Sequence, residues 1–177
     1  ASGMVDQNNS DDLVFASRSG DIYAVSQNGA PIYNSHFNTI FLFTPVLADV
    51  DGNAGLETIA GGMDGNVYVL SATGTLLPGF PFNVGGAFQS ELASADLDND
   101  NAWEIICGGS QGNLYVLEAG GAVKPGFPVQ LDGALTGAPT ITGNNRIVCS
   151  TPTTAYIISP TGQIVSQRTI DAAIAGG

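Results

Sequence analysis

The chain of 177 residues carries 16 acidic side chains against four Lys and Arg, which gives a formal net charge of −12. Such an acidic surface repels polyanions, which excludes nucleic acid as a natural partner, and no apolar run reaches the roughly 18 residues that a membrane span requires. Hydrophobic residues make up 44% and charged residues only 11%, a composition that excludes a disordered chain and suffices for one domain with a sizeable core.

Four short segments with a tyrosine at the same place recur along the chain. Their tyrosines are Tyr23, Tyr68, Tyr115 and Tyr156, so the spacings are 45, 47 and 41 residues. Each segment follows a turn and leads into a second turn that contains Gly, the residue that tight hairpins favour. Four-stranded antiparallel units that repeat every 40–50 residues are typical of propeller blades. We therefore predict an all-β fold, a β-propeller or propeller segment of four four-stranded antiparallel blades, with repeats at about 1–44, 45–90, 91–136 and 137–177.

The third repeat shows the four expected strands most clearly, at about 91–97, 104–109, 113–118 and 122–131. The last of these contains Pro125-Gly126-Phe127-Pro128, and the second repeat has Pro78-Gly79-Phe80-Pro81 in the same place. Two prolines cannot serve a central strand, which predicts an edge strand. We expect its phenylalanine to pack against the next sheet.

Two nine-residue loops between the first and second strands of a repeat carry side-chain oxygens at positions 1, 3, 5 and 9, all from carboxylates except Asn53 at position 5 of the first loop. They are Asp49–Glu57 and Asp96–Glu104, and they lie 47 residues apart in register. A tightly curled loop with this spacing aims hard oxygen ligands at one point, which suits Ca²⁺ with its six to eight oxygens at about 2.3–2.6 Å. We predict two Ca²⁺ sites, in which position 7 contributes its backbone carbonyl. The predicted ligands are Asp49, Asp51, Asn53, Gly55 and Glu57 in one loop, and Asp96, Asp98, Asp100, Ala102 and Glu104 in the other.

The other two repeats depart from this pattern. In the first, Met4 stands at position 1, and only Asp6, Asn8 and Asp12 remain, so a third metal site there is doubtful. In the fourth, the acidic loop is deleted and Arg146 stands where Glu57 and Glu104 stand, so no site is expected.

Few residues are suited to catalysis. The only histidine, His36, lies on an apparent loop and has no evident Ser or Cys partner in a recognisable motif. Cys107 and Cys149 lie in matching strands, where Ala60 and Ala16 stand in the other repeats. Their role is to fill small buried slots, and equivalent strands of neighbouring sheets, about 10 Å apart, are too distant for a disulfide. We expect no enzyme activity, no catalytic residue and no bound organic cofactor.

The two acidic loops with the strands that follow them resemble the FG-GAP/VCBS repeats of integrin α-subunits and bacterial surface proteins. The matching residues run from Ala48 through Asp49-Val50-Asp51-Gly52-Asn53 to Glu57-Thr58-Ile59-Ala60-Gly61-Gly62, and over the equivalent positions 95–109. The resemblance is strong over the second and third repeats and weak in the fourth. It implies Ca²⁺ in these loops and a cell-surface propeller, although members of the family usually have six to eight blades.

These observations favour a non-enzymatic, calcium-stabilised extracellular or surface module for protein or glycan binding, adhesion or self-assembly. The millimolar Ca²⁺ outside cells suits such loops, and Asn8-Asn9-Ser10 is a formal glycosylation acceptor. One alternative is the propeller portion of an extracellular polysaccharide-degrading enzyme, for which four basic residues make a poor groove. A quinoprotein is a weaker alternative, because Trp103 is the only tryptophan.

The expected repeat frame runs through both ends of the sequence, from a strand at 1–6 to the end of a fourth unit at 170–177. Four such units close as a small ring, pair with another copy into eight blades, or belong to a longer array. We expect self-association or further repeats.

Overall fold

The computed structural model describes residues 1–6, 8, 10–53 and 55–170. In this part of the chain there are sixteen strands in four four-stranded antiparallel sheets and no helix. Within each sheet the strands lie side by side in sequence order. The predicted fold class, four four-stranded antiparallel blades, is confirmed. No helix in the described residues is long and apolar enough to cross a membrane.

The sheets have the following bounds. The first contains β1 (Ser2–Gly3), β2 (Asp12–Ala16), β3 (Asp21–Val25) and β4 (Pro31–His36). The second contains β5 (Val46–Ala48), β6 (Glu57–Gly61), β7 (Asn66–Leu70) and β8 (Phe82–Asn83). The third contains β9 (Ala93–Ala95), β10 (Glu104–Gly108), β11 (Asn113–Leu117) and β12 (Val129–Gln130). The fourth contains β13 (Thr140–Ile141), β14 (Ile147–Ser150), β15 (Thr154–Ile158) and β16 (Ile164–Thr169).

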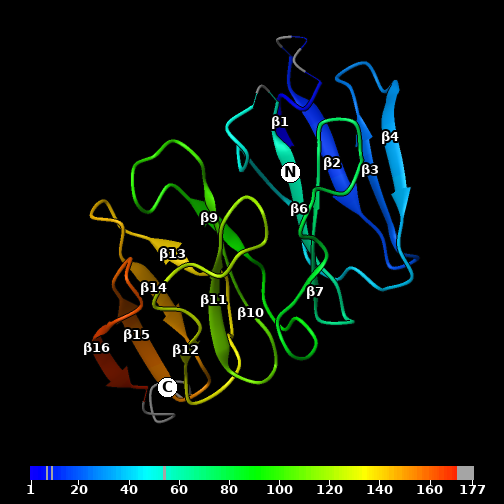
Figure 1. The fold of residues 1–177 in the computed structure, drawn as a ribbon. Helices are drawn as coiled ribbons and strands as arrows, with labels where there is room; N and C mark the ends of the chain where they lie inside the picture. Colours follow the sequence, from blue (N-terminus) through cyan, green and yellow to red (C-terminus); the bar gives the residue numbers. More distant parts are fainter. Residues whose placement is uncertain (7, 9, 54, 171–177) are drawn as a thin grey trace, which may run out of the picture.

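The four sheets follow one another along an arc, with the first and the fourth at its two ends (Figure 1). The first strands of neighbouring sheets, β5 and β9, are in contact. A sheet with two apolar faces must cover both, and stacking the sheets face to face does so for every face inside the arc.

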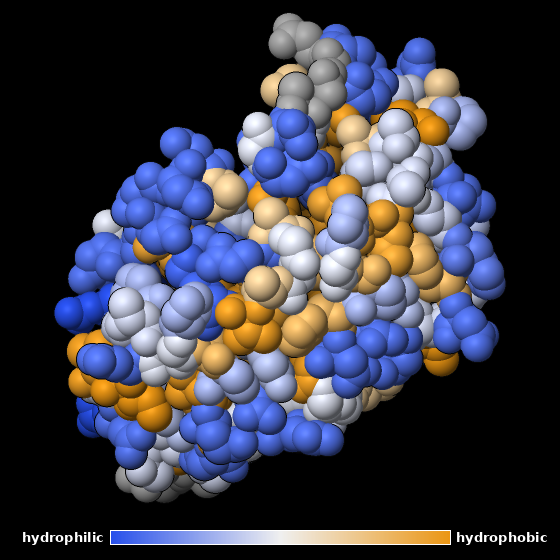
Figure 2. Space-filling view, in the orientation of Figure 1, coloured by the Kyte–Doolittle hydropathy of each residue, from blue (hydrophilic) through white to orange (hydrophobic). Residues whose placement is uncertain are grey.

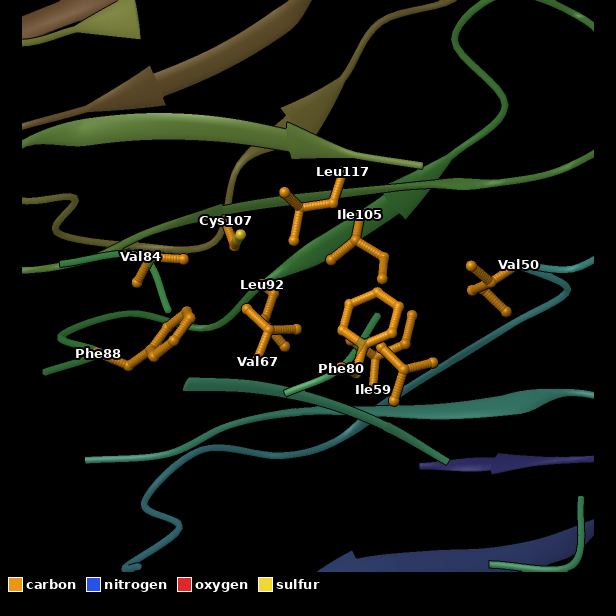
Figure 3. Packing of buried hydrophobic residues seen from close by; sticks show 12 residues of the cluster. Val50, Ile59, Val67, Phe80, Val84, Phe88, Leu92, Ile105, Cys107 and Leu117 are labelled. Atoms are coloured by element: carbon orange, nitrogen blue, oxygen red, sulfur yellow. The ribbon is translucent and has the colours of Figure 1, made fainter. Parts of the chain in front are cut away.

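The core consists of three apolar clusters, one between each pair of neighbouring sheets. Side chains of a strand alternate between the two faces of its sheet, so each central strand of the second and third sheets contributes to two clusters. Figure 3 shows the middle cluster, where Ile105 and Cys107 of β10 lie opposite Ile59 and Val67 of the second sheet. Phe88 also lies here, against the backbone of Gly61, where an added Cβ would be 2.8 Å from the aromatic ring.

The outermost strands are shorter than the sequence predicts. The expected strand at 122–131 reduces to β12 and a single bridge between Leu117 and Val123. Pro125 and Pro128 have no N–H to donate to a ladder, which confines the pairing to the residues on either side. The expected packing of the phenylalanines is confirmed: Phe80 is buried in the middle cluster, and Phe127 packs against the cluster between the third and fourth sheets.

The strand register corrects two details of the sequence alignment. Phe15 pairs with Tyr23, as Cys107 pairs with Tyr115 and Ala60 with Tyr68. The position opposite the tyrosine, which a small residue fills in the other repeats, is therefore occupied in the first repeat by Phe15 and not by Ala16. His36 ends strand β4 and does not lie on a loop. Both cysteines are buried and free, in line with their predicted role. Of the expected fourth unit, residues 171–177 lie outside the described part, as do Gln7, Asn9 and Ala54.

Candidate metal centre

Three carboxylates converge in each of the two complete acidic loops. In the loop between β5 and β6, oxygens of Asp49, Asp51 and Glu57 all lie within 4.8 Å of one another. In the loop between β9 and β10, the same holds for the residues 47 positions later, Asp96, Asp98 and Glu104. Two unit charges at this distance repel each other by about 3 kcal/mol at an effective dielectric constant of about 20. The donors are hard oxygens, so each loop fits a Ca²⁺-like cation.

The position-9 glutamates are buried and anchored through one oxygen. Glu57 is 3% exposed, and its Oε2 accepts a hydrogen bond from the amide of Val50 at 2.9 Å. Glu104 is 1% exposed, and its Oε2 accepts one from the amide of Leu97 at 2.7 Å. This anchor fixes the carboxylate below the loop and leaves Oε1 for another partner.

The curl of each loop comes from its first aspartate. Oδ1 of Asp49 accepts a hydrogen bond from the amide of Gly52 at 2.8 Å, and Oδ1 of Asp96 accepts one from the amide of Asn99 at 2.6 Å. Gly52 and Asn99 both have a positive φ, 71° and 64°. Gly and Asn are the residues that adopt this conformation most readily, so the loops close at the same point.

The triads contain three of the five predicted ligands of each loop. Asp100 is not part of its triad, and its Oδ1 instead accepts a hydrogen bond from the amide of Ala102 at 2.8 Å. Its ligand role, and those of Asn53, Gly55 and Ala102, stay predictions.

The burial of the two glutamates opposes their charge. Burial raises the pKa of Glu57 above its usual value, and the charges of Asp51 and Asp49 raise it further, whereas the hydrogen bond from the Val50 amide lowers it. Burial also raises the pKa of Glu104, although the Leu97 amide and Lys124 act in the opposite direction. A cation in either loop would relieve this cost, because it favours the charged form of its ligands.

Lys124 also lies at this site, which the acidic loop motif alone does not predict. Its Nζ lies 2.6 Å from Asp98 Oδ2, 2.9 Å from Glu104 Oε1 and 3.0 Å from Glu118 Oε1. Burial alone would lower the pKa of Lys124, but its hydrogen bonds to these three carboxylates raise it well above the usual value. The loop at 96–104 therefore already holds a positive charge against two of its three acids.

The second repeat has no such cation. Leu77 stands 47 residues before Lys124, and the two residues have the same backbone setting: the Leu77 amide donates to Val69 and the Lys124 amide to Val116, both at 2.8 Å. The residue in register with the Lys124 ammonium is thus apolar in the second repeat, and it packs against the middle cluster. One signal was available in the sequence, since Lys124 is its only lysine and it falls in register with a leucine.

The first and fourth repeats differ from the complete loops. Asp12 is fully buried, and its Oδ2 accepts hydrogen bonds from the amides of Val5 and Asp6, whereas its Oδ1 has no partner among the described residues. Oδ2 of Asp6 accepts a hydrogen bond from the side-chain amide of Asn8 at 2.8 Å. In the fourth repeat Arg146 is exposed and no acidic loop is present.

Hydrogen bonds join the loops of successive sheets to one another. The amide of Trp103, at position 8, donates to the carbonyl of Asp49 at 2.9 Å, and the amide of Leu56 donates to the carbonyl of Met4 at 3.3 Å. In the fourth repeat, the side chain of Asn145 donates to the carbonyl of Asp96 at 3.2 Å. Ordering one loop therefore also orders its neighbour.

Nucleophilic chemistry finds little support in the described residues. Nδ1 of His36 lies 2.9 Å from Asp21, and the hydroxyl of Ser19 donates to the same aspartate and not to the histidine. Hydrogen bonds from Ser19 and then His36 lower the pKa of Asp21. Burial raises the pKa of Cys107 far above its usual value and that of Cys149 to about 11, which disfavours a thiolate at either residue.

Solved structures with a fold similar to that of this chain include β-propeller-like proteins. BBS1N in complex with ARL6DN is 17% identical with a TM-score of 0.64, covering 92% of this chain and 50% of that one. The Vibrio cholerae biofilm matrix protein Bap1 is 17% identical with a TM-score of 0.70, covering 96% and 28%. BamB from Moraxella catarrhalis is 15% identical with a TM-score of 0.69, covering 96% and 52%. The chain thus spans about half, or less, of these propellers. No family model matches it, and no curated protein sequence matches it.

Proposed function

We propose that this chain is a non-enzymatic, calcium-stabilised propeller module of the FG-GAP/VCBS type, which acts outside the cell in protein or glycan binding, adhesion or assembly. The observation that carries the proposal is the pair of carboxylate triads, repeated 47 residues apart at the same end of neighbouring blades. Asp49, Asp51 and Glu57 hold one ion, and Asp96, Asp98 and Glu104 hold the other. A bound Ca²⁺ supplies charge neutralisation and fixes the loop.

The ion has a structural role in this proposal. Each triad connects two strands within one blade, and backbone hydrogen bonds join it to the loop of the next blade. An ion that binds the folded loop and not the unfolded chain stabilises the fold by about 2.7 kcal/mol at a free concentration 100 times its dissociation constant. The millimolar Ca²⁺ outside cells and the net charge of −12 support an extracellular location.

The role in recognition is supported by the absence of a competent nucleophile in the described residues and by the kind of fold. Bap1 is a biofilm matrix protein, and BBS1N was solved with a protein partner. We extend such a binding role to this chain.

The test is a calorimetric calcium titration of metal-free protein together with melting curves. We expect binding at both loops, weaker at 96–104 because Lys124 lies there, and a lower melting temperature after chelation. Asp49→Ala should remove the tighter binding event. Glu91→Gln serves as the control, because it removes an equal charge at an exposed residue outside the loops. A titration without heat and a melting curve that chelator does not shift would contradict the proposal.

A further inference from the structure

The two faces of each sheet have distinct partners inside the arc. In the two central strands, one set of alternate side chains packs on the following sheet and the other set on the preceding sheet. The set that faces forward comprises Val14, Ile22 and Ala24, then Ile59, Val67 and Val69, then Ile106, Leu114 and Val116. The set that faces backward comprises Ala60, Tyr68 and Leu70, then Ile105, Cys107 and Leu117, then Ile147, Cys149, Tyr156 and Ile158.

The first sheet leaves its backward face uncovered. By strand register the central strands give this face Leu13 and Phe15 on β2 with Val25 and Tyr23 opposite them on β3. Toward β4 the face also carries Asp21, Asn34 and His36. Leu13 is 54% exposed and Phe15 is 48% exposed, whereas their counterparts in the second sheet, Thr58 and Ala60, are buried. Phe15 and Tyr23 stack with ring centroids 5.1 Å apart. The face is therefore apolar over its two central strands, and no sheet among the described residues covers it.

In the part of the chain that the structure describes, no sheet covers the forward face of the fourth sheet. Val148, Ala155 and Ile157 occupy the places of the forward set and are only half-buried. In the outer strand β16, which is exposed throughout, Ser166 lies opposite Ile157 and Arg168 lies opposite Ala155 on this face. Figure 2 shows apolar atoms gathered over β15 and β16 at this end of the arc. The molecule thus carries both halves of one kind of sheet-to-sheet interface, at its opposite ends.

The sizes of the side chains on these two faces are complementary to each other. At the interior interfaces the slot beside the tyrosine is small, filled by Ala60, Cys107 or Cys149, and the forward residue that starts the third strand is large. That large residue is Ile22, Val67 or Leu114. At the ends of the arc the order is reversed: the slot holds Phe15 and the forward position holds Ala155. A large residue facing a small one preserves the packed volume, which cores tolerate best.

We infer that the backward face of the first sheet docks on the forward face of the fourth sheet of a second copy of this chain. Two such contacts, related by a two-fold axis, close eight sheets into one ring. Whether the eight sheets form a closed ring depends on the rotation from each sheet to the next. A head-to-tail contact whose rotation closes gives a ring. This chain covers 50% of BBS1N and 52% of BamB. A second copy of the chain is thus the partner in the assembly role proposed above, and the docking rests on that proposed role.

Light scattering after size exclusion, in calcium and over a concentration series, measures the assembly. We expect a mass twice the 18.0 kDa of one chain. Ala155→Phe places a second large residue against Phe15 and should raise the dimer dissociation constant about 100-fold. Phe15→Ala should weaken the dimer similarly by leaving a gap. The double variant Phe15→Ala with Ala155→Phe restores the large–small pair with its sides exchanged and should recover the dimer. Ile40→Thr is the control, because Ile40 is 46% exposed and lies outside both faces.

Each outcome decides the inference. A dimer with rescue in the double variant supports it. A monomer at every concentration, open polymers, or a dimer that Ala155→Phe leaves unchanged would overturn it, and a monomer would assign the two faces to blades outside this chain. Calcium titration of the monomeric variant separates the two proposals, since the triads lie apart from both faces. Calcium binding without dimerisation refutes the docking alone, and loss of calcium binding in every variant refutes the calcium role.

Discussion

Replacing Lys124 by Leu should make the third blade dependent on calcium. The substitution copies the second repeat, where Leu77 holds the equivalent position. In the absence of metal it leaves Glu104, 1% exposed, without its cationic partner at 2.9 Å. Removing one partner of a buried ion pair costs about 3–5 kcal/mol. We expect the lower value, about 3 kcal/mol, because Asp98 and Glu118 are 43% and 36% exposed and retain much of their hydration.

Calcium should reverse the loss. In the native chain an ion that enters the loop at 96–104 must displace the ammonium from Asp98 and Glu104, and in Lys124→Leu it need not. We expect the dissociation constant of this loop to fall at least tenfold, which corresponds to about 1.4 kcal/mol. Calorimetric titration measures the affinity, and urea unfolding with and without calcium measures the stability.

The reciprocal substitution is the matched control. Leu77→Lys should place an ammonium near Glu57 and weaken the loop at 49–57 while leaving the other loop unchanged. If Lys124→Leu bound calcium no more tightly than the native chain, the competition inferred from the three short contacts of Lys124 would be refuted. Unchanged stability of metal-free Lys124→Leu would show that the ion pairs do not stabilise the blade.

Two further substitutions test the interfaces between blades. Gly61→Ala should lower the unfolding free energy by about 1–3 kcal/mol in chemical denaturation, because its Cβ would lie 2.8 Å from the Phe88 ring; Gly137→Ala, with open space around it, should not. Hydrogen bonds from Thr151, Thr154 and Thr153 hold the pKa of Asp132 well below its usual 3.8, so its stabilisation is complete above that pH and is lost as the pH falls through the lowered value. Asp132→Asn should therefore melt below the native chain at neutral pH, and a gap that stayed constant down to strong acid would refute this role.

Much of the architecture was predictable from local pattern. The tyrosines recur with a period near 45 residues, and turns flank each one, because each blade is built from neighbouring segments of the chain. The curl of the acidic loops was predictable for the same reason: Asp49 bonds to Gly52, only three residues away. Local hydrogen bonds and strand alternation act over short sequence distances, so their signature remains readable in the order of residues.

The tertiary structure decided what depends on contacts between distant segments. Lys124 meets Asp98 across 26 residues, and no spacing rule brings a lysine of the segment before β12 into an acidic loop. Pairing with Tyr23 places Phe15 in the position that small residues fill in the other repeats, whereas the repeat pattern of the sequence predicts Ala16 there. The exposure of Leu13 and the half-burial of Ile157 depend on which sheet faces are covered. A face has the same alternating sequence whether a neighbour covers it or not, so only the packed arrangement of the sheets shows which faces stay open.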